Sequence, residues 1–351
     1  MMFAQIDTPA VLIDLDVAEA NIRKFQAHCD HHGLKLRPHI KTHKLPMLAQ
    51  AQIAAGAVGI TCQKISEAEA MISEGGISDV LITFNIIGAG KLKRLRRLAD
   101  KVTLSVVADN RSVADGLSGA FADAQTPLDV LVECDTGAGR CGVTSPEEAA
   151  GLADYIDGLA GLRFAGLMTY PPVGADQKVQ RWLNEAVDAL ANCGLKASVI
   201  SNGGSPGMWH AQNVSIATEY RIGTYIYNDR SLQVRGVCDW ADCAFTVLAT
   251  VISVPAHDRA VIDCGTKVLT SDLLGLNGNG HVLGRPDITI AGLSEEHGVL
   301  TADNINLAVG SRIRIVPNHA CVVSNMLDQV ILVRGDTCIG PQSVTARGKV
   351  W

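Results

Sequence analysis

Two histidines and two lysines gather in residues 37–44, Arg-Pro-His-Ile-Lys-Thr-His-Lys, beside a predicted strand at residues 35–38. A lysine at the carboxyl end of a parallel strand can be desolvated and lose its proton. A neutral amine attacks an aldehyde to form a Schiff base. Lys41 is therefore a candidate nucleophile. The alternative is a solvated basic loop without chemistry.

Two small turns rich in glycine and hydroxyl groups are candidates for holding a phosphate. Residues 201–205 read Ser-Asn-Gly-Gly-Ser, and residues 223–225 read Gly-Thr-Tyr. Backbone N–H groups in such turns can approach a phosphate where a helix begins. Taken alone, each turn is more often an ordinary strand-to-helix connection. Joined to an aldehyde-seeking lysine, they indicate pyridoxal 5'-phosphate (PLP), whose aldehyde needs an amine and whose phosphate needs donors. The candidate residues are Ser201, Gly204, Ser205, Gly223, Thr224 and Tyr225.

A candidate metal site lies further along the sequence, where one residue separates His319 from Cys321. Alternate residues of a strand point to the same side, so an extended segment would bring these side chains together. An imidazole and a thiolate favour Zn²⁺, with other coordination positions open to water or substrate. The alternative is a buried cysteine beside a surface histidine.

The surrounding elements predict a barrel. From about residue 8 to about residue 240, short apolar runs alternate with helix-length amphipathic segments, as in repeated strand–helix units of a parallel sheet. Candidate strands lie at residues 10–15, 35–38, 58–62, 79–83, 103–107, 129–134, 163–167, 197–201 and 219–222. About eight units, without a glycine-rich dinucleotide fingerprint, favour a TIM-type (β/α)8 barrel over a doubly wound sheet. The unusual residues follow predicted strands, whose carboxyl ends meet at one face of a barrel.

After about residue 240 the sequence changes to strand-rich runs separated by turns, at residues 244–254, 259–263, 307–315 and 329–334. We therefore expect an α/β protein with two domains. A PLP-binding barrel would occupy residues 8–240, and a mostly β domain carrying the metal motif would occupy residues 241–351. Residues 1–7 are expected to join the second domain.

Composition narrows the class of protein. The chain has 351 residues, of which 47% are hydrophobic and 19% are charged, with a formal net charge of −6. It can therefore bury a sizeable core. An acidic balance without a long basic run argues against a nucleic-acid or membrane partner. The absence of a secretory signal, of a membrane helix and of CxxC spacing among the ten cysteines is typical of a cytoplasmic protein.

Residues 37–44 together with Pro-Asn-His-Ala-Cys at 317–321 resemble the D-threonine aldolase and D-serine dehydratase family. The likeness covers most of the chain, through residues 7–10, 133–137 and 263–267. Members of this family are PLP enzymes with an alanine-racemase-like fold. The resemblance therefore implies that fold, PLP as the cofactor, and a homodimer.

The resemblance also implies roles for individual residues. Lys41 would carry PLP as a Schiff base, and His319 with Cys321 would hold a divalent ion (Zn²⁺, Mn²⁺ or Mg²⁺). Arg140, in an Asp-Thr-Gly-x-x-Arg pattern, is similar to the residue that faces the pyridoxal hydroxyl. Arg221 is similar to the one that faces the pyridine nitrogen. Tyr170 would lie near the ring, and Ser205, Gly223, Thr224 and Tyr225 near the phosphate.

Two lyase reactions on D-β-hydroxy amino acids fit this resemblance. An aldolase of the D-threonine type would release glycine and an aldehyde, with His43 or a metal-bound hydroxide as the base. A D-serine or D-3-hydroxyaspartate dehydratase would give an oxoacid and ammonia, with Lys41 taking the Cα proton. Cys321 resembles the dehydratases, because the aldolases often have aspartate there, whereas residues 322–328 resemble the bacterial aldolase branch.

A third possibility is a non-catalytic PLP-binding protein. Such carriers resemble the barrel alone. The metal motif and the second domain argue against this reading.

Overall fold

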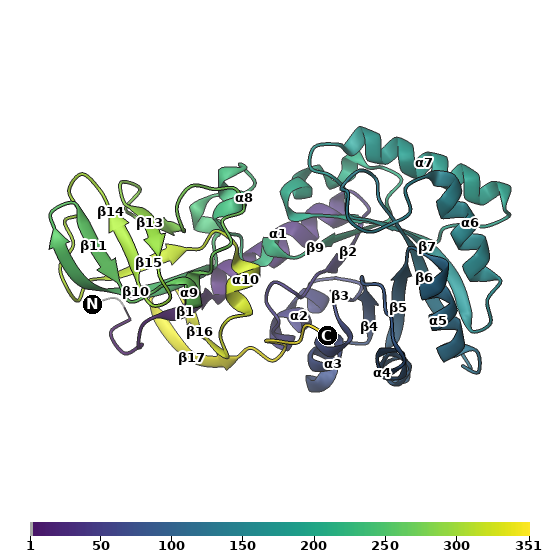
Figure 1. Cartoon of the computed structure of the whole chain (residues 1–351), viewed down its shortest axis with the longest axis horizontal. Helices are drawn as coiled ribbons and strands as arrows, with labels where there is room; N and C mark the ends of the chain where they lie inside the picture. Colours follow the sequence, from purple (N-terminus) through teal and green to yellow (C-terminus); the bar gives the residue numbers. More distant parts are fainter. Residues whose placement is uncertain (1–2) are drawn as a thin grey trace. The chain divides into compact units, whose positions relative to one another are not determined.

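The computed structural model describes residues 3–351, which form two compact units (Figure 1). Unit 1 comprises the segment through Lys24, Thr42–Leu45 and Thr224–Gly348. Unit 2 comprises Phe25–Lys41, Pro46–Gly223 and Lys349–Trp351. Helix α1 (Leu15–His31) begins in the first unit and ends in the second. The bounds of these units differ from the expected 8–240 and 241–351.

Unit 2 contains eight parallel strands. In spatial order they are β2 (Lys35–Pro38), β9 (Glu219–Ile222), β8 (Val199–Gly203), β7 (Leu162–Thr169), β6 (Leu128–Cys134), β5 (Thr103–Ala108), β4 (Asp79–Ile82) and β3 (Ile60–Cys62). A parallel bridge between His39 and Thr61 brings the two end strands together. This arrangement, with a helix after most strands, confirms the expected TIM-type barrel.

Six helices connect successive strands and cover the outside of the parallel sheet (Figure 1). They are α2 (Pro46–Ala54), α3 (Ile65–Met71), α4 (Ala89–Ala99), α5 (Arg111–Phe121), α6 (Pro146–Asp157) and α7 (Asp176–Asn192). Local sequence fixes where some of them begin. The Asn110 side chain accepts a hydrogen bond from Val113 N–H at the start of α5. The Ser145 side chain does the same for Glu148 N–H at the start of α6.

Unit 1 is mostly β, as expected. Its main path runs β13 (Thr289–Leu293), β14 (Gly298–Thr301), β11 (Arg259–Ile262), β10 (Phe245–Ala256), β1 (Ala10–Asp14), β16 (Gln329–Arg334) and β17 (Thr337–Ser343). Strand β15 (Arg312–Val316) pairs with β10 and with β12 (His281–Val282). The short helices of this unit are α8 (Arg230–Val234), α9 (Thr266–Leu269) and α10 (Ala320–Ser324).

The first predicted strand belongs to this sheet and not to the barrel. β1 pairs antiparallel with β10 and parallel with β16, and in Figure 1 the purple strand lies beside the yellow one. Leu12 packs with Leu248 and Val333 in an apolar cluster. An apolar run predicts a buried strand, but the run alone does not identify its pairing partner.

The inside of the barrel combines an apolar layer with a charged network. Leu81, Val107, Leu131 and Met168 form the apolar cluster. Arg37 on β2 pairs with Glu219 on β9 at 2.6 Å and also with Asp79 on β4. Buried charges are tolerated when they are paired and hydrogen-bonded.

In residues 3–351 no helix combines the length and apolar character needed to cross a bilayer.

Candidate active site

The candidate residues are divided between the two units. Unit 2 holds Lys41, Arg140, Tyr170, Ser201, Gly204, Ser205, Arg221 and Gly223. Unit 1 holds His43, Thr224, Tyr225, His319 and Cys321. Those of unit 2 lie in or after the last residues of β2, β6, β7, β8 and β9. Because these strands are parallel, their carboxyl ends form one face of the barrel, where enzymes of this architecture place their chemistry.

Lys41 lies in a turn whose backbone is anchored. Its N–H donates to His39 Nδ1 at 3.3 Å, and the N–H of buried Ile40 donates to Thr61 O at 3.0 Å. His39 is also hydrogen-bonded through Nε2 to Gln63. The Lys41 side chain itself is exposed. The barrel therefore fixes the backbone of this residue while its amine stays accessible to an aldehyde.

Arg221 is buried at the end of β9 and joined to the charged network. It donates to Ser201 Oγ at 2.6 Å and to Thr169 O at 2.8 Å, and Ser201 Oγ donates to Glu219 at 2.5 Å. Burial lowers the pKa of Arg221 to about 10, while Glu219 and Glu133 oppose that shift. The guanidinium thus stays charged at neutral pH. The hydroxyl of Ser201 is engaged with these two charged side chains.

Arg140 lies against Tyr170. The guanidinium carbon is 4.8 Å from the centre of the tyrosine ring, within the range of a cation–π contact. Asp135 shapes the loop that carries Arg140, because its carboxylate accepts the N–H groups of Gly137 and Gly139. Although partial burial raises the pKa of Asp135, these backbone hydrogen bonds bring it below its usual value.

A small cleft lies beside Tyr170 at the ends of β7 and β8. Its lining includes Asn202, Gly203, Gly204 and His210. Gly204 has φ 143°, a conformation that favours glycine, and its N–H donates to Arg221 O. The Asn202 Oδ1 atom is buried without a hydrogen-bond partner in the described chain. Because the two ends of an amide can be exchanged by a flip, Asn202 can turn an N–H toward a phosphate oxygen. The cleft therefore fits the phosphate end of PLP.

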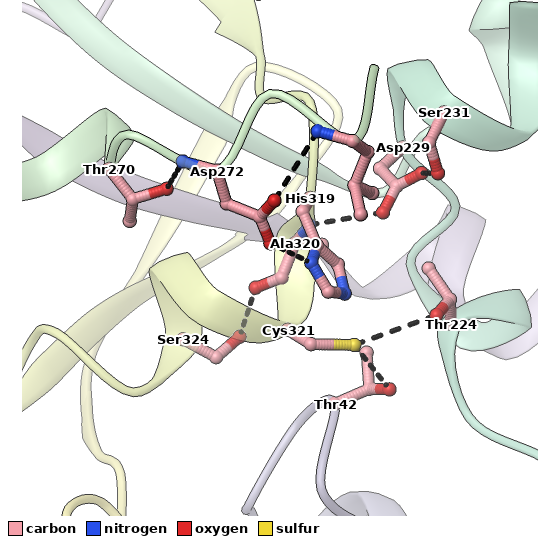
Figure 2. Close-up of polar contacts among 11 residues, drawn as sticks. Thr42, Thr224, Asp229, Ser231, Thr270, Asp272, His319, Ala320, Cys321 and Ser324 are labelled. Carbon is pink, nitrogen blue, oxygen red and sulfur yellow. Dashed lines mark hydrogen bonds and ion pairs between the residues drawn. The ribbon is translucent and has the colours of Figure 1, made fainter. Parts of the chain in front are cut away.

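The expected geometry of the metal motif is wrong in one respect. His319 and Cys321 do not alternate along a strand, because β15 ends at Val316 and α10 begins at Ala320. His319 is the extended residue before the helix (φ −139°, ψ 101°), and Cys321 lies in the first helical turn. Their side chains nevertheless point toward each other (Figure 2), and a hydrogen bond from the ring to Cys321 contributes to the raised pKa of His319.

An acidic residue orients the imidazole of His319. Nδ1 of the ring lies 2.7 Å from Asp272 Oδ2 (Figure 2), which leaves Nε2 to face Cys321. Burial disfavours the charged ring, but Cys321 and Asp272 outweigh it and raise the pKa of His319 to about 9. A carboxylate that holds one ring nitrogen while the other binds a metal is a common arrangement around metal-ligating histidines.

Hydroxyl groups surround the thiol of Cys321. The Sγ atom is 3.1 Å from Thr42 Oγ1 and 3.5 Å from Thr224 Oγ1. Thr42 directly follows Lys41 in the sequence. The phenol of Tyr227 is fully buried without a hydrogen-bond partner among residues 3–351. Burial is the main cause that raises the pKa of Tyr227, and the nearby Cys321 adds to it. Such an orphaned polar group fits a pocket that holds a hydrated ion.

These side chains have the chemistry of a two-ligand metal site. Within residues 3–351 no group of three or more His, Cys, Asp or Glu side chains is arranged to hold a metal. His319 and Cys321 would offer a divalent cation an imidazole and a thiolate, with other positions open to water or substrate, as in catalytic sites. The donor set, with Asp272 behind His319, fits a divalent cation.

His43 is buried, and its ring accepts the Leu45 N–H at Nδ1 over 3.1 Å. In a neutral ring with this contact the proton resides on Nε2. For His43 to take a proton at Nε2, its Nδ1 would carry the other proton and lose the Leu45 contact. The expected role as a base therefore requires a rearrangement of this turn.

Comparison with known proteins assigns the chain to a family. The model of the alanine racemase N-terminal domain matches residues 13–231, and a model of a serine dehydratase domain matches residues 244–333. A D-threonine aldolase from Arthrobacter sp. is 34% identical over 98% of this chain and 94% of its own length. The chain belongs to the D-threonine aldolase and D-serine dehydratase family. The expected resemblance is confirmed.

Solved structures of similar proteins share the fold of this chain. The crystal structure of D-threonine aldolase from Filomicrobium marinum is 33% identical, with a TM-score of 0.92 over 99% of this chain and 98% of that one. A D-threo-3-hydroxyaspartate dehydratase, solved as a cysteine-to-alanine mutant in the metal-free form, is 29% identical, with a TM-score of 0.86 over 98% of each chain.

Sequence reasoning missed three residues of unit 1 that surround the metal motif: Asp229, Asp272 and Tyr227. Asp229 precedes Arg-Ser-Leu, and an aspartate before a helical run is a recognisable start signal. Asp272 lies in a loop, and no local pattern connects it with His319. Tyr227 reads as an ordinary core residue.

Proposed function

We propose that this chain is a PLP- and divalent-metal-dependent lyase that cleaves D-β-hydroxy amino acids to glycine and an aldehyde. The observation that carries the proposal is the Asp272–His319–Cys321 arrangement in a chain that is 34% identical to a D-threonine aldolase over nearly its full length.

In this proposal each group of residues has a distinct task. Lys41 holds PLP covalently, and His319 with Cys321 holds the metal. Bound PLP supplies an electron sink for the breaking bond at Cα, and the bound metal lowers the pKa of the substrate hydroxyl. Arg221 faces the pyridine nitrogen as a cation, and its guanidinium is held by Ser201, whose hydroxyl is in turn bonded to Glu219.

The remaining residues bind and orient the cofactor. Arg140, stacked on Tyr170, faces the pyridoxal hydroxyl. The phosphate is received by Asn202, whose buried amide oxygen lacks a partner until the amide flips, and by the turns that contain Gly204, Ser205, Gly223, Thr224 and Tyr225. His43 moves the hydroxyl proton once its Nδ1 contact with Leu45 opens.

A dehydratase is the second candidate, and Cys321 favours it. The motif resembles the dehydratases in having cysteine at this position. A dehydratase is also among the similar structures. Elimination would need the same metal ligands, with Lys41 taking the Cα proton instead of leaving it in place. A non-catalytic PLP carrier is disfavoured, because the similarity to enzymes extends through both domains.

Product analysis separates these candidates. The purified protein is supplied with PLP and with Zn²⁺, Mn²⁺ or Mg²⁺ in turn, and it is offered D-threonine, D-serine and D-3-hydroxyaspartate. Glycine with an aldehyde identifies the aldolase, and an oxoacid with ammonia identifies the dehydratase. The L-enantiomers and a Lys41→Ala variant serve as controls. Release of neither product pair under any metal would refute the lyase proposal.

The homodimer and the cytoplasmic location stay predictions. Light scattering of the purified holoprotein tests the first, with a mass near twice 37.1 kDa as the expected result.

A further inference from the structure

The start of helix α8 is hydrogen-bonded to the segment that leads into the metal motif. Arg230 N–H donates to Pro317 O at 3.1 Å, and Ser231 N–H donates to Asn318 O at 3.3 Å. The Arg230 guanidinium also donates to Asn318 Oδ1 at 2.9 Å. These contacts join two segments of unit 1 that are far apart in the sequence. The path of the chain before His319 is therefore set by residues 229–231.

Asp229 occupies the centre of this junction. One carboxylate oxygen, Oδ1, accepts the Ser231 hydroxyl at 2.6 Å and the Leu232 N–H at 3.2 Å, which makes Asp229 the N-cap of α8. The other oxygen, Oδ2, accepts the Ala320 N–H at 3.1 Å (Figure 2). Ala320 is the residue between His319 and Cys321. The same carboxylate therefore caps one helix and holds the peptide that connects the two candidate ligands.

The burial of Asp229 is more than a helix cap requires. Its side chain is 0% exposed, whereas a capping side chain works equally well at the surface, as Ser145 shows at the start of α6. Burying a carboxylate is unfavourable unless hydrogen bonds compensate. Three donors meet that cost here, and one of them belongs to the metal motif. The buried negative charge also favours a cation nearby.

We propose that Asp229 is a positioning residue of the metal site. By holding the Ala320 N–H it fixes His319 as extended and Cys321 as helical, so that imidazole and thiol converge on one divalent cation. Its charge adds to the attraction for that cation. The inference rests on the proposed metal-dependent function. In it Asp229 does not bind the metal and acts through the backbone between the two ligands.

The test measures metal affinity directly. Zn²⁺ and Mn²⁺ dissociation constants are determined by calorimetry with chelator competition for the wild type, Asp229→Asn, Ser231→Ala and His319→Ala. The asparagine keeps the shape but loses the charge and one acceptor, so its dissociation constant should rise about 10–100-fold, as for other residues that support metal ligands. Ser231→Ala removes one donor to Asp229 and should give a smaller rise. In Co²⁺-loaded protein, the visible absorption of the thiolate-bound ion should change in Asp229→Asn.

Asn110→Ala is the matched control, because Asn110 caps α5 in unit 2 and has no contact with the metal motif. It should lower the melting temperature and leave the metal affinity unchanged. If Asp229→Asn keeps wild-type metal affinity and an unchanged Co²⁺ spectrum, Asp229 is only a helix cap. That result would overturn this inference and leave the proposed metal-dependent function standing. If Asp229→Asn does not fold, wild-type affinity in Ser231→Ala overturns it. Equal affinities in the wild type and His319→Ala would overturn the metal site itself.

Discussion

Asp272 accepts a hydrogen bond from Nδ1 of His319: its Oδ2 atom lies 2.7 Å from that nitrogen, so the Nε2 edge of the ring is turned toward Cys321. Removing this carboxylate should release the ring and weaken the metal site. We expect Asp272→Ala to raise the metal dissociation constant about 10–100-fold. Isothermal titration with Zn²⁺ measures this directly.

Asp287→Asn provides the control for the loss of one negative charge, because Asp287 pairs with Arg285 on the surface of the same unit. It should leave metal affinity unchanged. An equal loss of affinity in both variants would assign the effect of Asp272 to net charge and not to its contact with His319.

Metal affinity should fall as the pH is lowered. The pKa of His319 is raised to about 9 in the metal-free chain, and a cation binds only the deprotonated ring. Below that pH each binding event releases a proton from His319, so affinity should drop about tenfold per pH unit. Dissociation constants measured at several pH values test how steeply the affinity changes with pH. A value independent of pH between 7 and about 9 would exclude His319 as a ligand.

The same pKa has an opposite consequence for the metal-free protein. A folded-state pKa above the ordinary 6.5 means that charged His319 stabilises the fold, fully below pH 6.5 and no longer above about 9. Without metal, the free energy of unfolding should therefore decrease as the pH rises through this range. His319→Gln should lack this dependence in urea titrations.

Much of the barrel could be predicted from sequence because its strands are buried on both faces and read as short apolar runs. The predicted bounds at residues 35–38 and 219–222 agree with β2 and β9, although both of these strands also carry charged residues. β1 has the same apolar character, but its partners β10 and β16 are more than 200 residues away, and no local pattern names them. Strands β13, β14 and β17 went unpredicted, since each contains a glycine and none is a continuous buried apolar run.

In the candidate site, too, residues in local motifs could be predicted, and residues that depend on distant contacts could not. Local motifs marked Lys41, His319 and Cys321, because each is an unusual residue type at a strand end or in a short pattern. Asp272 reaches His319 across 47 residues, and Asp229 reaches Ala320 across 91. Supporting residues of this kind depend on how distant loops pack, which the sequence alone does not state. The helix α10 has only five residues, which is too short for a helical periodicity to be recognised in the sequence.

Lys41 should be the point of covalent attachment for PLP. Borohydride reduction of the holoprotein, followed by proteolysis and mass spectrometry, should find the pyridoxyl group on the peptide that contains Lys41. Lys41→Arg should lose both the attached group and activity, because an arginine stays protonated and cannot attack an aldehyde. Lys35→Arg, an exposed lysine at the start of β2, should keep both. Attachment to another lysine would end the proposed role of Lys41.

Breaking the charged network inside the barrel should strongly destabilise unit 2. The Glu219 side chain is only 3% exposed and accepts from both Arg37 and Ser201. Glu219→Gln removes its charge and leaves the buried Arg37 and Arg221 undercompensated, so unfolding should become easier by about 3–5 kcal/mol. Urea denaturation should show a lower midpoint with an unchanged slope. Asp129→Asn breaks the exposed Arg163 pair, which is 59% exposed on the arginine side, and should cost less than about 1 kcal/mol. Equal losses in the two variants would mean that burial adds nothing to the Glu219 contacts.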